Sequence, residues 1–357
     1  MLLISLLNQS KEIWMKIEIS VVIPVYNAKK TIKNCVDSAL KQDLESLEVI
    51  LVNDGSNDST AEILNQYDSN SKVKIFHQLN KGVSAARNKG LSHASGEYVF
   101  FLDSDDILDE GMLSKMYQFA KNNKIDLLSC WHKEPATTQY GGNENKSTSF
   151  VARTREEIGA HFVDIFPRSV CAKLFLRKVI EENNITFSTE MSLGEDMSFV
   201  YQYLMASKSI GVVNGVYYNI QNVNPQSLSK RYVQNIENSL LIQNQLWNQL
   251  LEVYPKIEEN YYRQHMDFRF YLASLYVNNL FKFDSPYSSK EKLDQITQQL
   301  KKYRLFLDEK VSKEKMPKNI NEMVVFYLLK LKIPVLIYSF YSFKEWWKRR
   351  KFKMKDK

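Results

Sequence analysis

The sequence is poor in the residue types that define several classes of protein. Among its 357 residues are only three cysteines, which are far apart and odd in number, Cys35, Cys130 and Cys171. They support neither a disulfide framework nor a zinc site, and they favour a reducing compartment. The 5 histidines do not cluster, and 11 glycines and 8 prolines are too few for a fibrous or disordered chain. With 44% hydrophobic and 25% charged residues, the chain is globular and long enough for one large core domain and an appendage.

An excess of positive charge is missing everywhere except at the C-terminal end. The net charge is +7, but residues 344–357 hold eight Lys or Arg and two acidic residues, so this segment alone carries +6. The rest of the chain is close to neutral. This distribution argues against binding of nucleic acid and favours a basic tail that contacts an acidic surface.

The features of a signal peptide are missing as well. Residues 1–7 are apolar, but no basic segment precedes them and no small-residue cleavage site follows them. We expect residues 1–16 to form an N-terminal extension; alternatively, translation begins at Met15.

What the chain does contain, between residues 18 and 130, is an alternation of strand and helix signals. Short and almost continuously apolar runs predict strands at 19–25, 47–52, 73–76, 97–102 and 125–129. Helix signals lie between them, and together they predict an α/β fold with a parallel sheet covered by helices on both faces. Residues 131–160 are polar and predict a loop or hairpin, residues 170–230 return to the core domain, and the chain beyond 231 reads as helical.

An acidic cluster directly follows the fourth of these strands. The apolar run Val99–Leu102 leads into Asp103, Asp105 and Asp106. Because close carboxylates repel one another, the cluster indicates either a bound cation, such as a divalent metal with a phosphorylated substrate, or a solvated turn that caps the next helix. Ligands of such sheets bind at the carboxyl ends of the strands. Further polar side chains follow the first two strands at Tyr26, Asn27 and Asp54, so the sequence predicts one cleft there.

Four sequence blocks that occur in order carry a resemblance to a known family. They are Val22–Asn27, Val52–Thr60, Asn80–Asn88 and Phe101–Asp106. This series resembles family 2 glycosyltransferases of the bacterial capsule and exopolysaccharide type, over residues 17–230. The resemblance implies a GT-A fold, which is a Rossmann-like and mostly parallel sheet with flanking helices, followed here by a helical C-terminal region at 231–357.

The resemblance also implies a nucleotide-sugar site, for which a UDP-sugar is the expected donor. Its residues would be Pro24, Tyr26, Asn27, Asp54, Arg87, Asp103, Ser104 and Asp106. Tyr26 would pack on the base, Asp54 would accept the uracil N–H, and Arg87, with Lys81 as a weaker candidate, would balance the diphosphate. Asp106 would contact the donor sugar or hold the loop. Structural alternatives are a core aromatic for Tyr26, a turn residue for Asp54, an acid-paired core residue for Arg87 and a helix cap for Asp106.

Asp103-Ser104-Asp105 resembles the DxD motif of this family, which implies a Mg²⁺ or Mn²⁺ ion. Asp105 would bind the metal, and Asp103, a second candidate ligand, would mainly hold the ribose side. Oxygen ligands suit these ions, which neutralise a diphosphate leaving group.

A second signature of the family is similar to Cys171–Phe175 followed by Gly194–Phe199. The resemblance implies that Asp196, beside Glu195, is the general base toward the acceptor hydroxyl in an inverting displacement. Lys173 would help to hold the acceptor or a phosphate. The alternatives are that the two acids merely favour a helix N-terminus and that Lys173 is a surface residue.

The C-terminal segment from about 320 to 357 predicts contact with an anionic membrane surface. Its apolar stretches, 323–329 and 333–343, are interrupted by Lys330, Lys332 and Pro334, which argues against a membrane-spanning helix and for an interfacial one. Trp346 and Trp347 beside a basic run suit the headgroup region. The alternative is an amphipathic helix docked on the protein's own core.

These features together predict the biological setting. Because the processive Gln-x-x-Arg-Trp motif is absent, we expect one sugar to be added per acceptor, which would be a saccharide, expected to be lipid-linked, at the cytoplasmic face of the membrane. An alternative of another class is an inactive nucleotide-binding module that serves as a partner subunit. The acidic pairs argue against it. A nucleotidyltransferase would need a glycine-rich loop where this chain has Pro24–Asn27.

Overall fold

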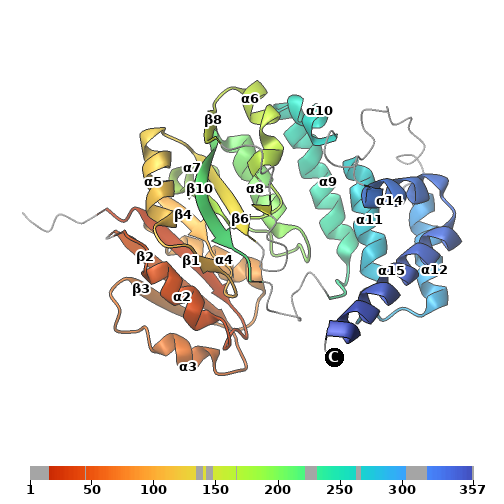
Figure 1. Ribbon diagram of the computed structural model, residues 1–357, viewed down its shortest axis with the longest axis horizontal. Helices are drawn as coiled ribbons and strands as arrows, with labels where there is room; N and C mark the ends of the chain where they lie inside the picture. The colour runs from red at the N-terminus through yellow and green to blue at the C-terminus, as the bar shows by residue number, and fades with distance from the viewer. Residues whose placement is uncertain are drawn as a thin grey trace, which may run out of the picture. The chain divides into compact units, whose positions relative to one another are not determined.

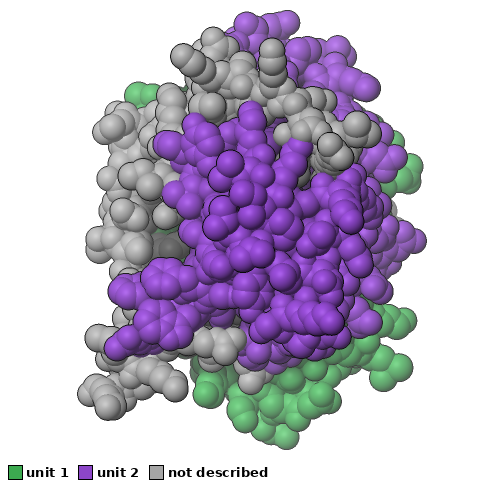
Figure 2. All heavy atoms as spheres, turned by 90° about the vertical axis from the view of Figure 1, so that its right-hand side faces the viewer, with its two compact units in different colours: residues 1–151, 170–187, 206–222 green, residues 152–169, 188–205, 223–357 purple. Residues whose placement is uncertain are grey.

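The computed structural model describes residues 16–44, 46–133, 140–141, 148–165, 167–221, 231–262, 267–302 and 320–355. The chain folds into two compact units, each assembled from separate segments. Unit 1 comprises residues 1–151, 170–187 and 206–222, and unit 2 comprises residues 152–169, 188–205 and 223–357. Figure 2 colours the atoms of the two units separately. Apart from Lys16, the predicted N-terminal extension lies outside the described residues.

Unit 1 is built on a mixed sheet. Its strand order is β3-β2-β1-β4-β9-β6-β10-β5, with β7 paired to β6 and β8 to β10. The strands are β1 (Ile19–Val25), β2 (Leu47–Asp54), β3 (Val73–Gln78), β4 (Tyr98–Phe101), β5 (Ile107–Leu108), β6 (Leu127–Lys133), β7 (Tyr140–Gly141), β8 (Phe150–Ala152), β9 (Lys173–Leu176) and β10 (Ile210–Asn219). Every residue of β1, β2 and β4 is buried, which explains why these strands are mostly apolar.

Helices connect the strands of this sheet. They are α2 (Ile32–Leu40), α3 (Thr60–Asn65), α4 (Val83–Ser92), α5 (Met112–Asn122) and α7 (Arg177–Glu182). The strand order, together with the right-handedness that such crossovers follow, puts α2 and α3 on one face of the sheet and α4 on the other. Figure 1 shows α2 crossing the sheet at β1 and β2. Gly90 lets α4 approach β1 closely, because a Cβ there would lie 2.4 Å from Val22.

The predicted α/β class with a mostly parallel sheet and flanking helices is confirmed, but the second half of the sheet differs from a simple parallel array. Strand β9 lies between β4 and β6 and is antiparallel to both. The strands β5, β9 and β10 were not singled out in the sequence, although Ile210–Asn219 is rich in β-branched and aromatic residues. Within the polar segment 131–160, β6 and β7 pair antiparallel as a hairpin would.

Unit 2 is helical. Its elements are α6 (Arg155–Ala160), the 3₁₀ helix η1 (Phe162–Ile165), α8 (Glu195–Ala206), α9 (Ile236–Val253), α10 (Lys256–Tyr262), α11 (Phe268–Leu280), α12 (Ser289–Lys302), α14 (Ile320–Leu331) and α15 (Pro334–Lys355). An aromatic cluster forms its core, in which Trp247 stacks on Phe268 with ring centroids 4.5 Å apart and packs against Tyr261 at 4.7 Å. The predicted helical C-terminal region is therefore confirmed.

Helices α14 and α15 bury one set of apolar side chains and expose another. Phe326 packs on Phe270 of α11, and Tyr341 packs on Phe281, with ring centroids 4.5 and 5.7 Å apart. Pro334 opens α15, where a missing N–H costs no helical hydrogen bond. Among the described residues, no helix combines the length and the hydropathy that a membrane crossing requires.

Candidate active site

The carboxyl ends of three adjacent strands carry the predicted donor-site residues. Strand β1 pairs in parallel with β2 on one side and with β4 on the other, so the ends of these strands share one edge of the sheet. Tyr26 and Asn27 follow β1, Asp54 ends β2, and Asp103 lies two residues beyond β4. The structure therefore brings these groups to one edge of unit 1, as the sequence predicts.

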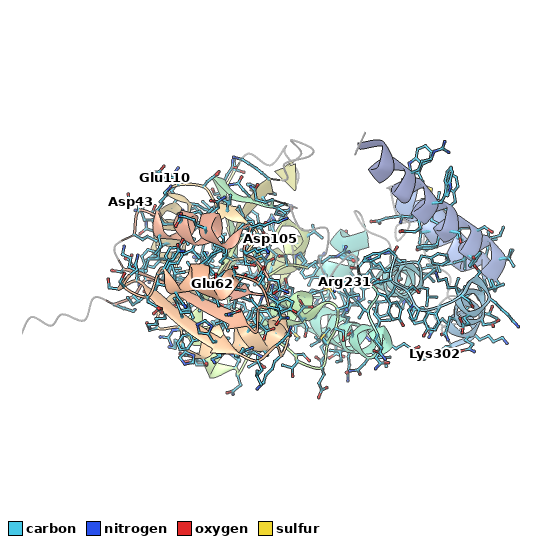
Figure 3. The ribbon with its side chains drawn as sticks, turned by 90° about the horizontal axis from the view of Figure 1, so that it is seen from below. Asp43, Glu62, Asp105, Glu110, Arg231 and Lys302 are labelled. Atoms are coloured by element: carbon cyan, nitrogen blue, oxygen red, sulfur yellow. The ribbon has the colours of Figure 1, made fainter. Side chains whose placement is uncertain are left out.

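The acidic cluster forms a tight turn, in which the backbone N–H of Asp106 donates to the carbonyl oxygen of Asp103 at 3.0 Å. The exposure of its members differs. The Asp103 side chain is 40% exposed, Ser104 and Asp105 are half-buried, and Asp106 is buried. Asp105 is labelled in Figure 3, in the turn after β4.

Asp106 is held by two donors from the β10 end of the sheet. The Tyr218 hydroxyl donates to Oδ2 at 2.7 Å, and the Gln221 backbone N–H donates to Oδ1 at 2.9 Å. The same Tyr218 oxygen accepts a hydrogen bond from the Asp103 N–H at 3.2 Å, so one hydroxyl group is bonded to the first and the last residue of the turn. Burial, reinforced by the negative charge of Asp103, raises the pKa of Asp106 to about 7.

This environment excludes the helix-cap alternative for Asp106, while contact with a donor sugar stays a prediction. Helix α5 begins at Met112 with Gly111 as its N-cap, so Asp106 does not cap it. The carboxyl instead holds the loop. Tyr218 is a site residue that the sequence reasoning missed, and the only available signal was its place in an apolar, β-branched run.

Arg87 on α4 is a buried cation directed at this turn. Its side chain is 4% exposed, and Nη2 donates to Asp103 Oδ1 at 3.0 Å. The guanidinium lies 5.3 Å from the centre of the Phe187 ring. The structural alternative, a pairing with an acid of the strand-end loop, is thus observed, while a role toward diphosphate stays a prediction.

The Asp54 carboxylate organises the loop before α4. Oδ1 accepts from Gln78 Nε2 and from the Lys81 N–H, and Oδ2 accepts from the Gly82 N–H, each at 2.8 Å. A carboxylate offers about four acceptor positions, so one remains for another donor such as an imide N–H. Gly82 has φ +87°, a conformation that favours glycine.

The segment after β1 is tied to the segment after β2. Asn27 has a left-handed backbone with φ 49°, its Oδ1 accepts the Asn57 N–H at 2.8 Å, and its own N–H donates to Ser56 Oγ at 3.0 Å. Tyr26 is 45% exposed, so it is not the buried core aromatic of the structural alternative. Pro24 is buried within β1 and contributes to the strand rather than to the exposed surface of the site.

Lys173 and the acidic pair Glu195-Asp196 lie in different environments. Lys173, on β9, is fully buried, and its ammonium donates to the Cys171 carbonyl at 3.3 Å. It is not a surface lysine, and in this position an acceptor would reach it only after the surrounding chain moved. Glu195 and Asp196 are half-buried and open helix α8 of unit 2, so the predicted helix start is observed.

Asp103 and Asp105 fit a site for a divalent cation to which the phosphates of a bound substrate would also contribute ligands. Among the described residues, no group of three or more His, Cys, Asp or Glu side chains forms a metal site. Mg²⁺ is commonly held by one or two carboxylates together with substrate phosphates, and Asp103 and Asp105 supply such a pair in one turn.

Comparison with known proteins gives results that agree with this geometry. Residues 20–183 match the model of the family described as glycosyl transferase family 2, a span that ends before Glu195. The uncharacterized glycosyltransferase EpsJ of Bacillus subtilis is 29% identical over 218 residues, which cover 59% of this chain but only 63% of EpsJ. The poly(ribitol-phosphate) beta-N-acetylglucosaminyltransferase TarP of Staphylococcus aureus is 29% identical over 274 residues, or 74% of this chain and 80% of TarP.

A solved structure shares the fold over most of the chain. In the crystal structure of S. aureus TarS 1–349 in complex with UDP-GlcNAc, the similar region spans 90% of this chain and 89% of the TarS chain. The TM-score is 0.64 and the sequence identity is 22%. At that identity the likeness establishes the fold, which is GT-A.

Proposed function

We propose that this chain, whose residues 20–183 match glycosyl transferase family 2 and whose fold is GT-A, transfers one sugar from a UDP-sugar to a hydroxyl group of a saccharide acceptor, with inversion at the anomeric carbon. We propose further that the acceptor is lipid-linked and that the product is a surface polysaccharide or cell-wall glycan. The activity named for TarP, which modifies poly(ribitol phosphate), supports this setting.

The observation that carries the proposal is the shared edge formed by the ends of β1, β2 and β4. There an exposed aromatic ring, Tyr26, lies at the end of the strand next to Asp54, a carboxylate with one acceptor position left. Beyond the other neighbouring strand lies the Asp103–Asp106 turn with the buried cation of Arg87. This set matches what a uridine diphosphate presents: a flat base, an imide N–H, and a diphosphate.

In the proposed reaction the acceptor hydroxyl oxygen attacks the anomeric carbon of the donor sugar. The new carbon–oxygen bond forms as the bond to the diphosphate breaks, and UDP leaves with the electron pair of that bond. Asp196 takes the proton of the hydroxyl, and Glu195 lies beside it at the start of α8. Arg87, which pairs with Asp103, holds positive charge beside the turn that faces the departing diphosphate.

Asp105 and Asp103 would hold a Mg²⁺ or Mn²⁺ ion, which when bound neutralises charge on the diphosphate. The protein's own part is to hold the turn that carries these two carboxylates. The Arg87 guanidinium donates to the Asp103 carboxylate, and the Tyr218 hydroxyl holds the backbone N–H of Asp103 and the carboxyl of Asp106.

For location we propose the cytoplasmic face of the cell membrane, with α15 as the contact. Its exposed apolar side chains include Val335 (56%), Phe343 (59%), Trp346 (49%) and Trp347 (51%), while Tyr341 packs inward. The same helix thus docks on its own unit and presents aromatic side chains outward, next to a strongly basic end. Aromatic rings and basic residues together suit an anionic headgroup layer.

A donor screen tests the proposed function. The full chain is incubated with UDP-GlcNAc, UDP-glucose or UDP-galactose and with Mn²⁺ or Mg²⁺, and release of UDP is measured with and without a saccharide acceptor. We expect metal-dependent UDP release from one donor, lowered in Asp196→Asn. If no donor is turned over although UDP binds, the inactive-module alternative replaces the proposal.

A further inference from the structure

The loop before the acidic pair is fastened to a helix that lies far along the sequence. Within unit 2, Ser192–Gly194 leads directly into Glu195 and Asp196, the first residues of α8. The Ser192 backbone N–H donates to Ser239 Oγ at 2.9 Å. The Leu193 carbonyl accepts from Gln243 Nε2 at 2.8 Å. Both side-chain partners lie on one face of α9, four residues apart, so the loop is held at two nearby peptide groups.

Gly194 fits against the same glutamine. Its φ is +81°, and a Cβ built there would lie 2.3 Å from Gln243 Nε2 and 2.7 Å from Cδ. No side chain is possible at that position without moving the carboxamide. The Gly194 carbonyl then accepts the first hydrogen bond of α8, from the Ser198 N–H at 3.0 Å. The turn into the helix and the face of α9 are therefore complementary in shape as well as in hydrogen bonding.

The two side chains of α9 that make these contacts are buried, and the hydrogen bonds themselves are partly buried. Ser239 and Gln243 are each 1% exposed. A buried hydrogen bond is lost at greater cost than an exposed one, because the group left behind stays unsatisfied. The direction in which α8 leaves the loop is thus determined by α9.

We propose that Ser239 and Gln243 are positioning residues for the acidic pair, acting through the Ser192–Gly194 loop to fix where Asp196 lies. The inference rests on the proposed function, in which Asp196 takes the acceptor proton. A general base must lie within hydrogen-bond reach of the proton that it removes, and a displacement of about 1 Å costs up to about a hundredfold in rate.

The chain offers a closely matched control at the other end of α8. The Tyr254 hydroxyl, just after α9, donates to the Leu204 carbonyl at 2.7 Å and is also buried. Gln243→Leu removes a side-chain donor to a backbone carbonyl of the loop before α8. Tyr254→Phe removes a side-chain donor to a backbone carbonyl near the C-terminal end of α8, eight residues after Asp196.

The first test is kinetic and uses metal-dependent hydrolysis of the best of the three UDP-sugars, in which water replaces the acceptor. We expect Gln243→Leu to lower kcat about tenfold or more, with the donor KM changed by less than about twofold. Ser239→Ala should act in the same direction, and Tyr254→Phe should leave both constants unchanged. In an Asp196→Asn background, Gln243→Leu should cause no further loss, because a residue that acts through Asp196 has nothing left to position.

The second test is structural and does not depend on turnover. Hydrogen exchange of peptides covering 188–200 should accelerate in Gln243→Leu and in Ser239→Ala, and not in Tyr254→Phe. Unchanged exchange, an equal loss of kcat in Tyr254→Phe, or additive losses with Asp196→Asn would each overturn the inference. Absence of hydrolysis by the wild-type chain would instead count against the proposed function, and the exchange experiment would still decide the contact.

Discussion

Asp106→Asn should make the stability of this protein less dependent on pH. The group is 6% exposed, and burial together with the charge of Asp103 raises its pKa from an ordinary 3.8 to about 7. Between about pH 4 and pH 7, Asp106 is therefore protonated in the folded chain and ionised in the unfolded chain. The stability associated with this proton is fully present below about pH 4 and is lost as the pH rises through about 7.

The size of the effect follows from the two pKa values. A shift of about 3 units corresponds to about 4 kcal/mol over the whole range, because each unit is worth about 1.4 kcal/mol. Between pH 5 and pH 8 the wild-type free energy of unfolding should fall by about 2.5 kcal/mol through this group. Asn at this position carries no charge at either pH and keeps an oxygen that can accept from the Gln221 N–H.

The assay is urea unfolding of wild type and variant at pH 5 and pH 8, with EDTA present so that no divalent cation binds the turn. The free energy of unfolding of Asp106→Asn minus that of wild type should be about 2.5 kcal/mol higher at pH 8 than at pH 5. Asp109→Asn, the same change at a half-buried position three residues on, controls for loss of a charge in this segment. An equal effect of Asp106→Asn at both pH values would refute the reasoning.

Three further predictions concern the site and the tail. Tyr218→Phe removes one buried and one partly buried hydrogen bond of the acidic turn, so it should lower the free energy of unfolding by about 2 kcal/mol and raise the donor KM, measured by urea unfolding and UDP release. Asp105→Ala should abolish metal-dependent UDP release, and retained activity would contradict its assignment as a metal ligand. Replacing Phe343, Trp346 and Trp347 together by Ser should release the chain from anionic liposomes in co-sedimentation. Because these rings are exposed, the circular dichroism spectrum should not change. Undiminished binding would mean that α15 is not the membrane contact.

Much of the donor side could be predicted from the sequence because its signals are local. Apolar runs such as Ile19–Val25 mark strands buried on both faces, and a polar residue directly after such a run must lie at a sheet edge. Tyr26, Asp54 and Asp103 follow from this pattern alone, and their order along the chain carries the family resemblance. The helical character of the chain beyond 231 is equally local.

Partners distant in sequence were decided only by the tertiary structure. Nothing near Asp106 indicates that Tyr218, more than a hundred residues later, buries it and closes its turn, or that β9 enters the sheet antiparallel to β4. Similarly, Gly194 reads as an ordinary turn residue until α9 places Gln243 against it. Local patterns indicate which segments form buried strands and helices. The burial and charge state of Asp106 and the position of Asp196 depend instead on which distant side chain packs beside them. The sequence therefore predicted most of the candidate site residues, and the fold determined how they are held.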